Sequence, residues 1–82
     1  MNNSEILKTI KEIVIDVLDI QDPDTFKMTE SSKIEYYSEW DSLAHINIIT
    51  QIESTFALRF SLNELEDLTE INDFIKIINS KI

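Results

Sequence analysis

Apolar side chains recur along the first part of the chain at the spacing of an α-helix. Within residues 5–20 they stand three and four positions apart, which predicts an amphipathic helix with one buried face; they are Ile6, Leu7, Ile10, Ile13, Val14, Val17 and Leu18. Asn2 and Glu5 resemble a capping box at its start. Because Pro23 disfavours the helical conformation at the residue before it, we expect this helix to stop near Ile20.

The same periodicity predicts a second long helix from about Ser42 to Phe56. At about 100° per residue, one face gathers Ile46, Ile49, Ile52 and Phe56, with Ile48 at its edge. Leu43 falls to one side of this face, so we expect it either to be exposed for a partner or to pack against the preceding loop. The helix should end near Ala57, in a chain that has no glycine for a left-handed cap.

Two shorter apolar patterns follow toward the C-terminus. Residues 61–68 predict a short third helix or turn, with Leu62, Leu65 and Leu68 facing inward. The last helix is expected from about Glu70 to Ser80, with Thr69 as its N-cap. Its apolar face consists of Ile71, Phe74, Ile75 and Ile78.

No sustained period runs through residues 21–40, and a loop of this length is unusual in a compact domain. We expect its apolar side chains to pin it to the helices, with room for a short helical turn; they are Phe26, Met28, Ile34, Tyr36, Tyr37 and Trp40. Strand alternation is absent from the sequence. The pattern therefore predicts an all-α fold in a single domain over residues 1–82: a small four-helix bundle with a long loop between the first two helices and a short third helix.

Composition narrows the classes of partner. Seven basic residues face sixteen acidic ones, for a formal net charge of -9. This balance disfavours nucleic acid and anionic membrane surfaces and favours partners with basic patches, although simple solubility is an equally good explanation. No cysteine is present, which excludes a disulfide, a thiolate metal site and a thiol nucleophile. With no secretory pattern and no run of ~20 apolar residues, we expect a cytoplasmic protein without membrane insertion.

Candidate chemistry lies in the stretch WDSL, where Asp41 and Ser42 stand together at the start of the second helix. A helix N-cap needs only one of these side chains. If Asp41 is the cap, the Ser42 hydroxyl lies near the positive end of the helix dipole, where free N–H groups favour a phosphate or another anion. Ser42 is therefore a candidate modification site, with an ordinary first-turn serine as the alternative.

Two other chemical interpretations fit the residues poorly. Asp41, Ser42 and His45 suggest a hydrolase, but such an enzyme needs an oxyanion hole and a shielded pocket, and the chain has no glycine-rich elbow. His45 also falls within the apolar arc, which favours a partly buried packing role. The segment DPDTFKMTESSK has lysines where a calcium loop requires glycine and a carboxylate, so we predict neither catalytic residues nor a metal site.

The order of these elements resembles the acyl carrier protein family. A DSL motif is followed by a helix that ends in E-x-x-F, at Glu53 and Phe56, then by a short acidic helix and an apolar last helix. DSL alone is a weak motif, but its position about halfway along an acidic helical chain makes the match specific. The resemblance covers nearly the whole chain.

The resemblance implies that Ser42 carries phosphopantetheine, donated by coenzyme A through a separate phosphopantetheinyl transferase. The terminal thiol of this arm would hold an acyl or aminoacyl group as a thioester and present it to partner enzymes. The protein would thus be a carrier and not an enzyme, and we expect a monomer. Other implied partners are an acyl-loading or adenylating enzyme and a downstream acyltransferase or synthase with basic docking patches.

Two further sets of residues follow from the resemblance. A cargo lining would comprise Ile46, Ile49, Leu65, Leu68 and Ile71, for which ordinary core packing is the alternative. A partner-facing surface would comprise Asp41, Leu43, Glu53, Glu64, Glu66 and Asp67, and solvated charge is the alternative for the last four.

Departures from the family pattern bear on the pathway. Trp40 precedes the motif, and Ala44 and Asn47 stand where carriers of fatty-acid synthesis usually have acids. The glycines that peptidyl carriers have before the serine are missing. W-D-S-L is more similar to specialised stand-alone carriers, including those for polyketide-type or adenylate-activated cargo and the D-alanyl carriers of cell-wall modification. We therefore expect a specialised biosynthetic pathway; the alternative from another class is an unmodified carrier-like helical module that acts only by protein–protein contact.

Overall fold

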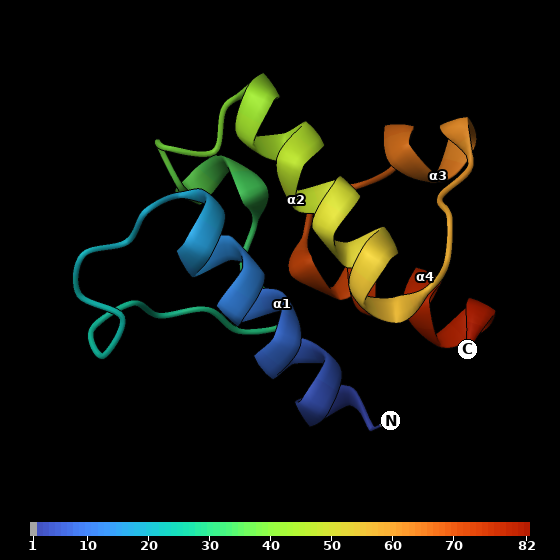
Figure 1. Ribbon diagram of the computed structural model, residues 1–82, viewed down its shortest axis with the longest axis horizontal. Coiled ribbons are helices and arrows are strands. Elements are labelled where there is room, and N and C mark those ends of the chain that lie inside the picture. Colours follow the sequence, from blue (N-terminus) through green and yellow to red (C-terminus); the bar gives the residue numbers. More distant parts are fainter. Residues whose placement is uncertain (1) are drawn as a thin grey trace.

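The computed structural model describes residues 2–82, and its regular structure is helical (Figure 1). The helices are α1 (Asn3–Val17), α2 (Ser42–Phe56), α3 (Leu62–Glu66) and α4 (Ile71–Lys81), and a 3₁₀ turn, η1 (Ile34–Tyr36), interrupts the long loop between α1 and α2. Strand pairing in the described residues is limited to one isolated bridge between Lys33 and Glu70. The predicted all-α fold is confirmed. No helix in this part of the chain is long and apolar enough to cross a membrane.

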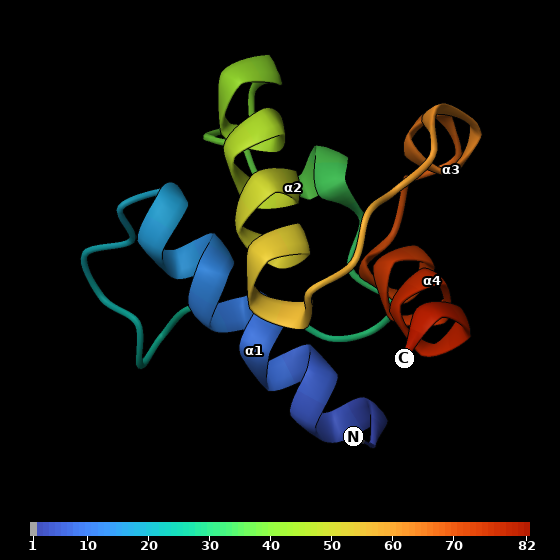
Figure 2. The same cartoon turned by 45° about the vertical axis from the view of Figure 1, so that its right-hand side comes forward.

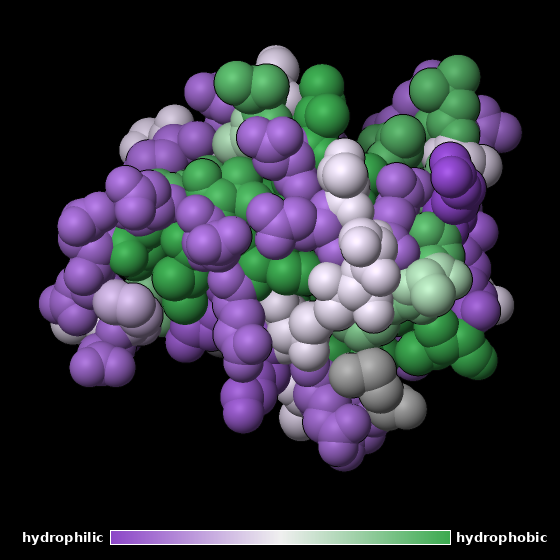
Figure 3. Space-filling model, in the orientation of Figure 1, coloured by the Kyte–Doolittle hydropathy of each residue, from purple (hydrophilic) through white to green (hydrophobic). Residues whose placement is uncertain are grey.

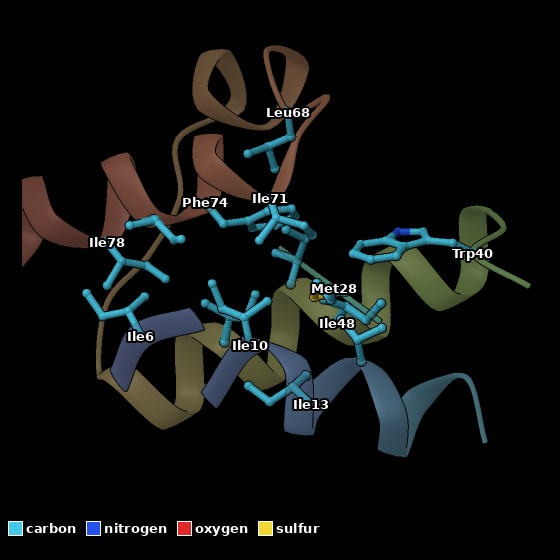
Figure 4. Close-up of a cluster of buried hydrophobic side chains, with 14 of the residues drawn as sticks. Ile6, Ile10, Ile13, Met28, Trp40, Ile48, Leu68, Ile71, Phe74 and Ile78 are labelled. Atoms are coloured by element: carbon cyan, nitrogen blue, oxygen red, sulfur yellow. The ribbon is translucent and has the colours of Figure 1, made fainter. Parts of the chain in front are cut away.

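Three helices enclose the core, and the short α3 lies at the rim (Figures 1 and 2). α1 contacts both α2 and α4. Figure 4 shows Ile6 and Ile10 of α1 facing Phe74 and Ile78 of α4, with Ile48 of α2 beside them, and all five side chains are fully buried. Burying a side chain of this size contributes roughly 1.5–3 kcal/mol, so this cluster is the main support of the fold.

The buried face of α2 includes Ile49 and Ile52 as predicted, but it differs from the predicted face at Ile46. Ala44, Ile48 and Ile52 form the stripe that packs inward, with Ile49 beside it. Ile46 lies two residues before Ile48, about 200° round the helix, and its side chain is 61% exposed. The placement of Ile46 on the core face is therefore wrong, because α1 packs against the opposite side of the helix.

α1 ends earlier than predicted and for a different reason. Its last residue is Val17, and Asp19 follows in the left-handed conformation at φ 54°. The N–H of Ile20 donates to the Ile15 carbonyl (3.0 Å) and that of Asp19 to the Asp16 carbonyl (3.3 Å), which is a Schellman motif. The stop is therefore built by an aspartate at the C′ position, and Pro23 lies beyond it. At the other end, the Asn2 side chain accepts from the Glu5 N–H (2.8 Å), which confirms Asn2 as the N-cap. The second half of the predicted capping box, a return bond from the Glu5 side chain to the Asn2 N–H, is not formed in residues 2–82.

α4 begins at Ile71, with Glu70 and not Thr69 at the N-cap. Oδ2 of Asp73 accepts hydrogen bonds from the N–H groups of Thr69 (3.0 Å) and Glu70 (2.9 Å) and from the Thr69 hydroxyl (3.1 Å). An N-cap hydroxyl must accept a hydrogen bond from a backbone N–H of the first turn. The Thr69 hydroxyl instead donates to Asp73, so the prediction that Thr69 is the N-cap is wrong. Burial raises the pKa of the Asp73 carboxyl, but these hydrogen bonds outweigh it and hold the pKa below its ordinary value.

Two side chains expected to face inward are exposed instead: Leu62 at 72% and Tyr36 at 67%. α3 has only five residues, and it reaches the core through Leu65 and then Leu68 past its end, so Leu62 at its start lies outside. In a 3₁₀ turn successive side chains point about 120° apart, so η1 directs Ile34 inward and Tyr36 outward. The other predicted anchors hold the loop: Met28 and Trp40 are buried, and Phe26, Ile34 and Tyr37 pack against the core.

Ala57 closes α2 in the left-handed conformation, at φ 55° and ψ 49°, as expected for a chain without glycine. A residue with a Cβ atom in this conformation is strained by roughly 1–2 kcal/mol. Glycine removes this strain, but part of the gain is lost because glycine gives up more conformational entropy on folding. We expect Ala57→Gly to raise the free energy of unfolding by about 0.5–1 kcal/mol, measured by urea denaturation. Ala57→Val should shift the midpoint the opposite way; a lower midpoint for the glycine variant would contradict this account.

Candidate functional site

At the start of α2, Asp41 caps the helix and the neighbouring Ser42 keeps a hydroxyl that is free of hydrogen bonds in residues 2–82. Asp41 is the N-cap: its Oδ1 accepts from the Ala44 N–H (2.8 Å) and its carbonyl accepts from the His45 N–H (2.9 Å). Ser42 is the first helical residue, and its side chain is exposed. Because the cap is complete without it, the serine hydroxyl is available for chemistry.

The backbone around Ser42 presents free donors. Within residues 2–82, neither the N–H of Ser42 nor that of Leu43 has a protein acceptor, and the Ser42 hydroxyl makes no hydrogen bond. Such N–H groups at the positive end of a helix dipole stabilise an anion. A phosphate ester on Ser42 would therefore lie beside two unpaired N–H donors.

Trp40 and His45 form a hydrogen-bonded pair beside this site. The indole Nε1–H of Trp40 donates to Nδ1 of His45 (3.0 Å), and the two rings lie 6.1 Å apart between centroids. Trp40 is buried, whereas His45 is half-buried. Burial lowers the pKa of His45 from its ordinary value of 6.5, so the ring is neutral near pH 7. The predicted packing role is confirmed, and a hydrogen bond adds to it.

The trio that suggested a hydrolase is not assembled. No hydrogen bond in the described residues joins Ser42 to His45, and Nδ1 of His45 is occupied by Trp40. The same part of the chain contains no group of three His, Cys, Asp or Glu side chains that could hold a metal ion.

A mainly apolar groove of about 280 Å³ opens between α2 and α3, and its lining begins one turn from Ser42. Its lining consists of His45, Ile46, Ile49, Thr50, Leu65 and Glu66. In Figure 3, hydrophobic surface covers the N-terminal end of α2 and part of α3, with a notch between them. A larger open depression of about 680 Å³ lies at the other end of α2, around Ala57 and Arg59.

The groove contains part of the predicted cargo lining. It brings together Ile46, Ile49 and Leu65, whereas Leu68 and Ile71 are buried in the core. Thr50 belongs to the lining and was missed, because a helical wheel centred on apolar residues gives no weight to a threonine at the edge. The exposure of Ile46, which contradicts the predicted core face, is what places this side chain in the groove.

The acidic surface residues fall into two groups. Asp41, Glu66 and Asp67 are exposed, although the Asp41 carboxylate also caps α2. Glu53 accepts from the N–H of Phe60 (2.9 Å), and Glu64 accepts from the N–H of Ser61 (2.7 Å). Glu53 and Glu64 thus hold the segment between α2 and α3 in place.

Glu64 also links α3 to the end of the chain. Its Oε1 lies 3.1 Å from Nζ of Lys81 in α4. The hydrogen bond from the Ser61 backbone lowers the pKa of this carboxyl, and Lys81 acts in the same direction.

The remaining surface of α2 is uncharged. Leu43 is 69% exposed, one of the two alternatives that the sequence left open. From Ser42 to Ile52 the helix contains no Asp, Glu, Lys or Arg. An apolar and neutral strip therefore lies between Asp41 at one end of α2 and the carboxylates of α3.

The Trp40–His45 pair predicts a pH dependence. As pH falls, Nδ1 takes a proton and can no longer accept from the indole. A histidine whose pKa is lower in the folded than in the unfolded state destabilises the fold as pH falls from about 6.5 through the folded pKa. Trp40 is the only tryptophan, so its fluorescence reports the change directly. We expect its emission to titrate with a midpoint below 6.5, and the urea midpoint to fall in the same window.

His45→Gln is the matched control for this titration, because a glutamine oxygen can still accept from the indole but does not titrate. The variant should lack the transition. If parent and variant titrate identically between pH 5 and 7, carboxylates and not His45 are responsible.

Comparison with known proteins identifies relatives of the whole chain. No profile of a known protein family matches the chain. The chain is 33% identical over 82 residues to an acyl carrier protein of Thermosynechococcus vestitus, across 100% of this chain and 98% of the relative. Its fold is similar to the solution NMR structure of the holo acyl carrier protein from Geobacter metallireducens, with a TM-score of 0.79 and 28% identity over 92% of this chain and 83% of that one. The chain therefore belongs to the acyl carrier protein family, whose members are carriers and not enzymes.

Proposed function

We propose that Ser42 carries phosphopantetheine. In the transfer, Oγ of Ser42 attacks the phosphorus that bears the pantetheine arm in coenzyme A. The new Ser42–phosphate bond forms as the pyrophosphate bond breaks, adenosine 3′,5′-bisphosphate leaves, and the hydroxyl proton passes to a base of the phosphopantetheinyl transferase. The observation that carries the proposal is an exposed serine that the helix cap does not use, in a chain of this family.

The residues around Ser42 fit this group. The N–H groups of Ser42 and Leu43 are free to donate to phosphate oxygens, and the first turn of α2 contains no acidic side chain that would repel them. When attached, the group supplies a terminal thiol that holds an acyl or aminoacyl cargo as a thioester, which this cysteine-free chain cannot do by itself.

The proposal also includes a cargo site and a partner site. We assign Ile46, Ile49 and Leu65 to a groove that shelters an acyl group, and Leu68 and Ile71 to core packing. For the partners we retain a docking surface with Leu43 as its apolar contact. Its exposed carboxylates, at Asp41, Glu66 and Asp67, would face basic residues of the transferase, of an acyl-loading or adenylating enzyme, and of a downstream acyltransferase or synthase.

The pathway belongs to the same proposal. The uncharged first half of α2 favours a specialised biosynthetic pathway over general fatty-acid synthesis, because Ala44 and Asn47 replace the expected acids. We place this activity in the cytoplasm, where coenzyme A and the partner enzymes would be found.

Intact-mass measurement tests the proposal. The purified chain is incubated with coenzyme A and a broad-specificity phosphopantetheinyl transferase, and a modified peptide is then located by fragmentation. A gain of one phosphopantetheine group on Ser42 is expected. No gain with several transferases would instead favour an unmodified helical module that acts by protein–protein contact.

A further inference from the structure

The groove between α2 and α3 has one uncommitted hydrogen-bond donor among its side chains. Ile46, Ile49 and Leu65 offer none, and an ionised Glu66 can only accept. The Thr50 hydroxyl donates its proton to the Ile46 carbonyl (2.9 Å). Among the lining residues this leaves His45.

The hydrogen bond from Trp40 fixes which nitrogen of His45 is the donor. An indole N–H can only donate, so Nδ1, which receives it at 3.0 Å, is unprotonated. The neutral ring therefore carries its proton on Nε2. Within residues 2–82 this Nε2–H has no acceptor, yet no unpaired side-chain nitrogen or oxygen is buried there. Nε2–H is thus reachable from outside the protein, on a residue that lines the groove.

We propose that Nε2–H of His45 donates a hydrogen bond to a carbonyl oxygen of the Ser42-linked arm or of its acyl cargo. The inference rests on the proposed function, because it needs an arm on Ser42. His45 follows Ser42 by three residues, a spacing that places the two on neighbouring positions of one helix face. The donor is neutral and Glu66 lies in the same lining, so the site favours a neutral carbonyl over a carboxylate. His45 is then a positioning residue that distinguishes cargo by its oxygen atoms.

The test uses the parent chain, whose single histidine makes its ring nitrogens identifiable by ¹⁵N NMR without assignment. Spectra are recorded for the unmodified chain and for chains loaded with the arm alone, with a butyryl arm and with an acetoacetyl arm. The two acyl groups have the same length and differ by one ketone. In at least one loaded form we expect the Nε2-bound proton to move downfield and its exchange with water to slow about tenfold. Nδ1 should remain unprotonated throughout.

The loaded forms distinguish the source of the carbonyl. A shift with the arm alone assigns the contact to the arm's amides. A shift with both acyl groups assigns it to the thioester carbonyl, and a shift with acetoacetyl alone assigns it to the cargo ketone. Each of these outcomes supports the inference.

Two variants serve as controls. Ser42→Ala, treated with the same reagents, should show an unchanged Nε2 signal, because nothing is attached. Thr50→Val removes the one side-chain hydroxyl among the lining residues and should keep the shift. A gain in mass with an unchanged Nε2 signal in all loaded forms would overturn the inference and leave the proposed function intact. No gain in mass would overturn both.

Discussion

Ser42→Ala is expected to abolish the gain in mass while leaving the fold intact. The substitution removes the Oγ atom that is proposed to form the phosphate ester, so loading should fall below detection. Stability should change by no more than about 0.5 kcal/mol, because Asp41 supplies the cap and the Ser42 hydroxyl has no protein partner in residues 2–82. Intact mass after transferase treatment and the urea midpoint by circular dichroism measure the two effects separately.

Ser54→Ala provides the matched control. Ser54 is also an exposed serine of α2, and the variant should load as completely as the parent. Full loading of Ser42→Ala would move the attachment site elsewhere. Unfolding of Ser42→Ala would mean that the serine, and not Asp41 alone, holds the start of the helix.

Phe74→Ala is expected to remove a large fraction of the stability of the fold. Phe74 is fully buried, and its ring lies 6.2 Å from Trp40, 6.5 Å from His45 and 6.4 Å from Phe60 between centroids. Truncating a buried phenylalanine costs about 3–5 kcal/mol. A chain of 82 residues has a total stability of only about 4–12 kcal/mol at ~0.05–0.15 kcal/mol per residue.

Thermal unfolding followed by circular dichroism measures this loss, with a melting temperature expected to fall by about 4–8 °C per kcal/mol. Tyr36→Ala removes an aromatic side chain that is 67% exposed and should leave the melting temperature nearly unchanged. Equal effects of the two variants would show that the aromatic cluster around Phe74 does not hold the fold.

Capping residues and apolar periodicity correctly predicted where α2 begins and ends. Asp41 capped α2 as predicted, and the helix runs from Ser42 to Phe56 as expected. The orientation of α2 was harder to predict, because a helical wheel ranks apolar positions but does not show which neighbours cover them. Ile46 and Ile48 are both isoleucines, and the packing of α1 against α2 decides that Ile48 is the buried one.

Other features depend on contacts that no local pattern encodes. The left-handed Asp19 ends α1 where glycine would be the usual signal. The bond between Trp40 and His45 joins the end of a loop to the first turn of a helix. Its partners are five residues apart, a spacing that indicates neither a capping motif nor a helix-face pair. The exposed position of Ser42 at the start of α2 was predictable, because its neighbour Asp41 already fulfils the capping role.

Because the neutral strip on α2 is flanked by charged residues, different residues would control the association rate and the dissociation rate of a partner. Charges at the edge of an interface mainly govern the association rate and its dependence on salt, whereas most affinity differences arise in the dissociation rate. For a partner that docks here, the exposed Glu66 and Asp67 would set the rate of encounter, and Leu43 and Ile46 would set the residence time. Added salt would then lower the association rate of the partner without raising its dissociation rate. Turnover on such a carrier would be limited by association at high salt and by dissociation at low salt.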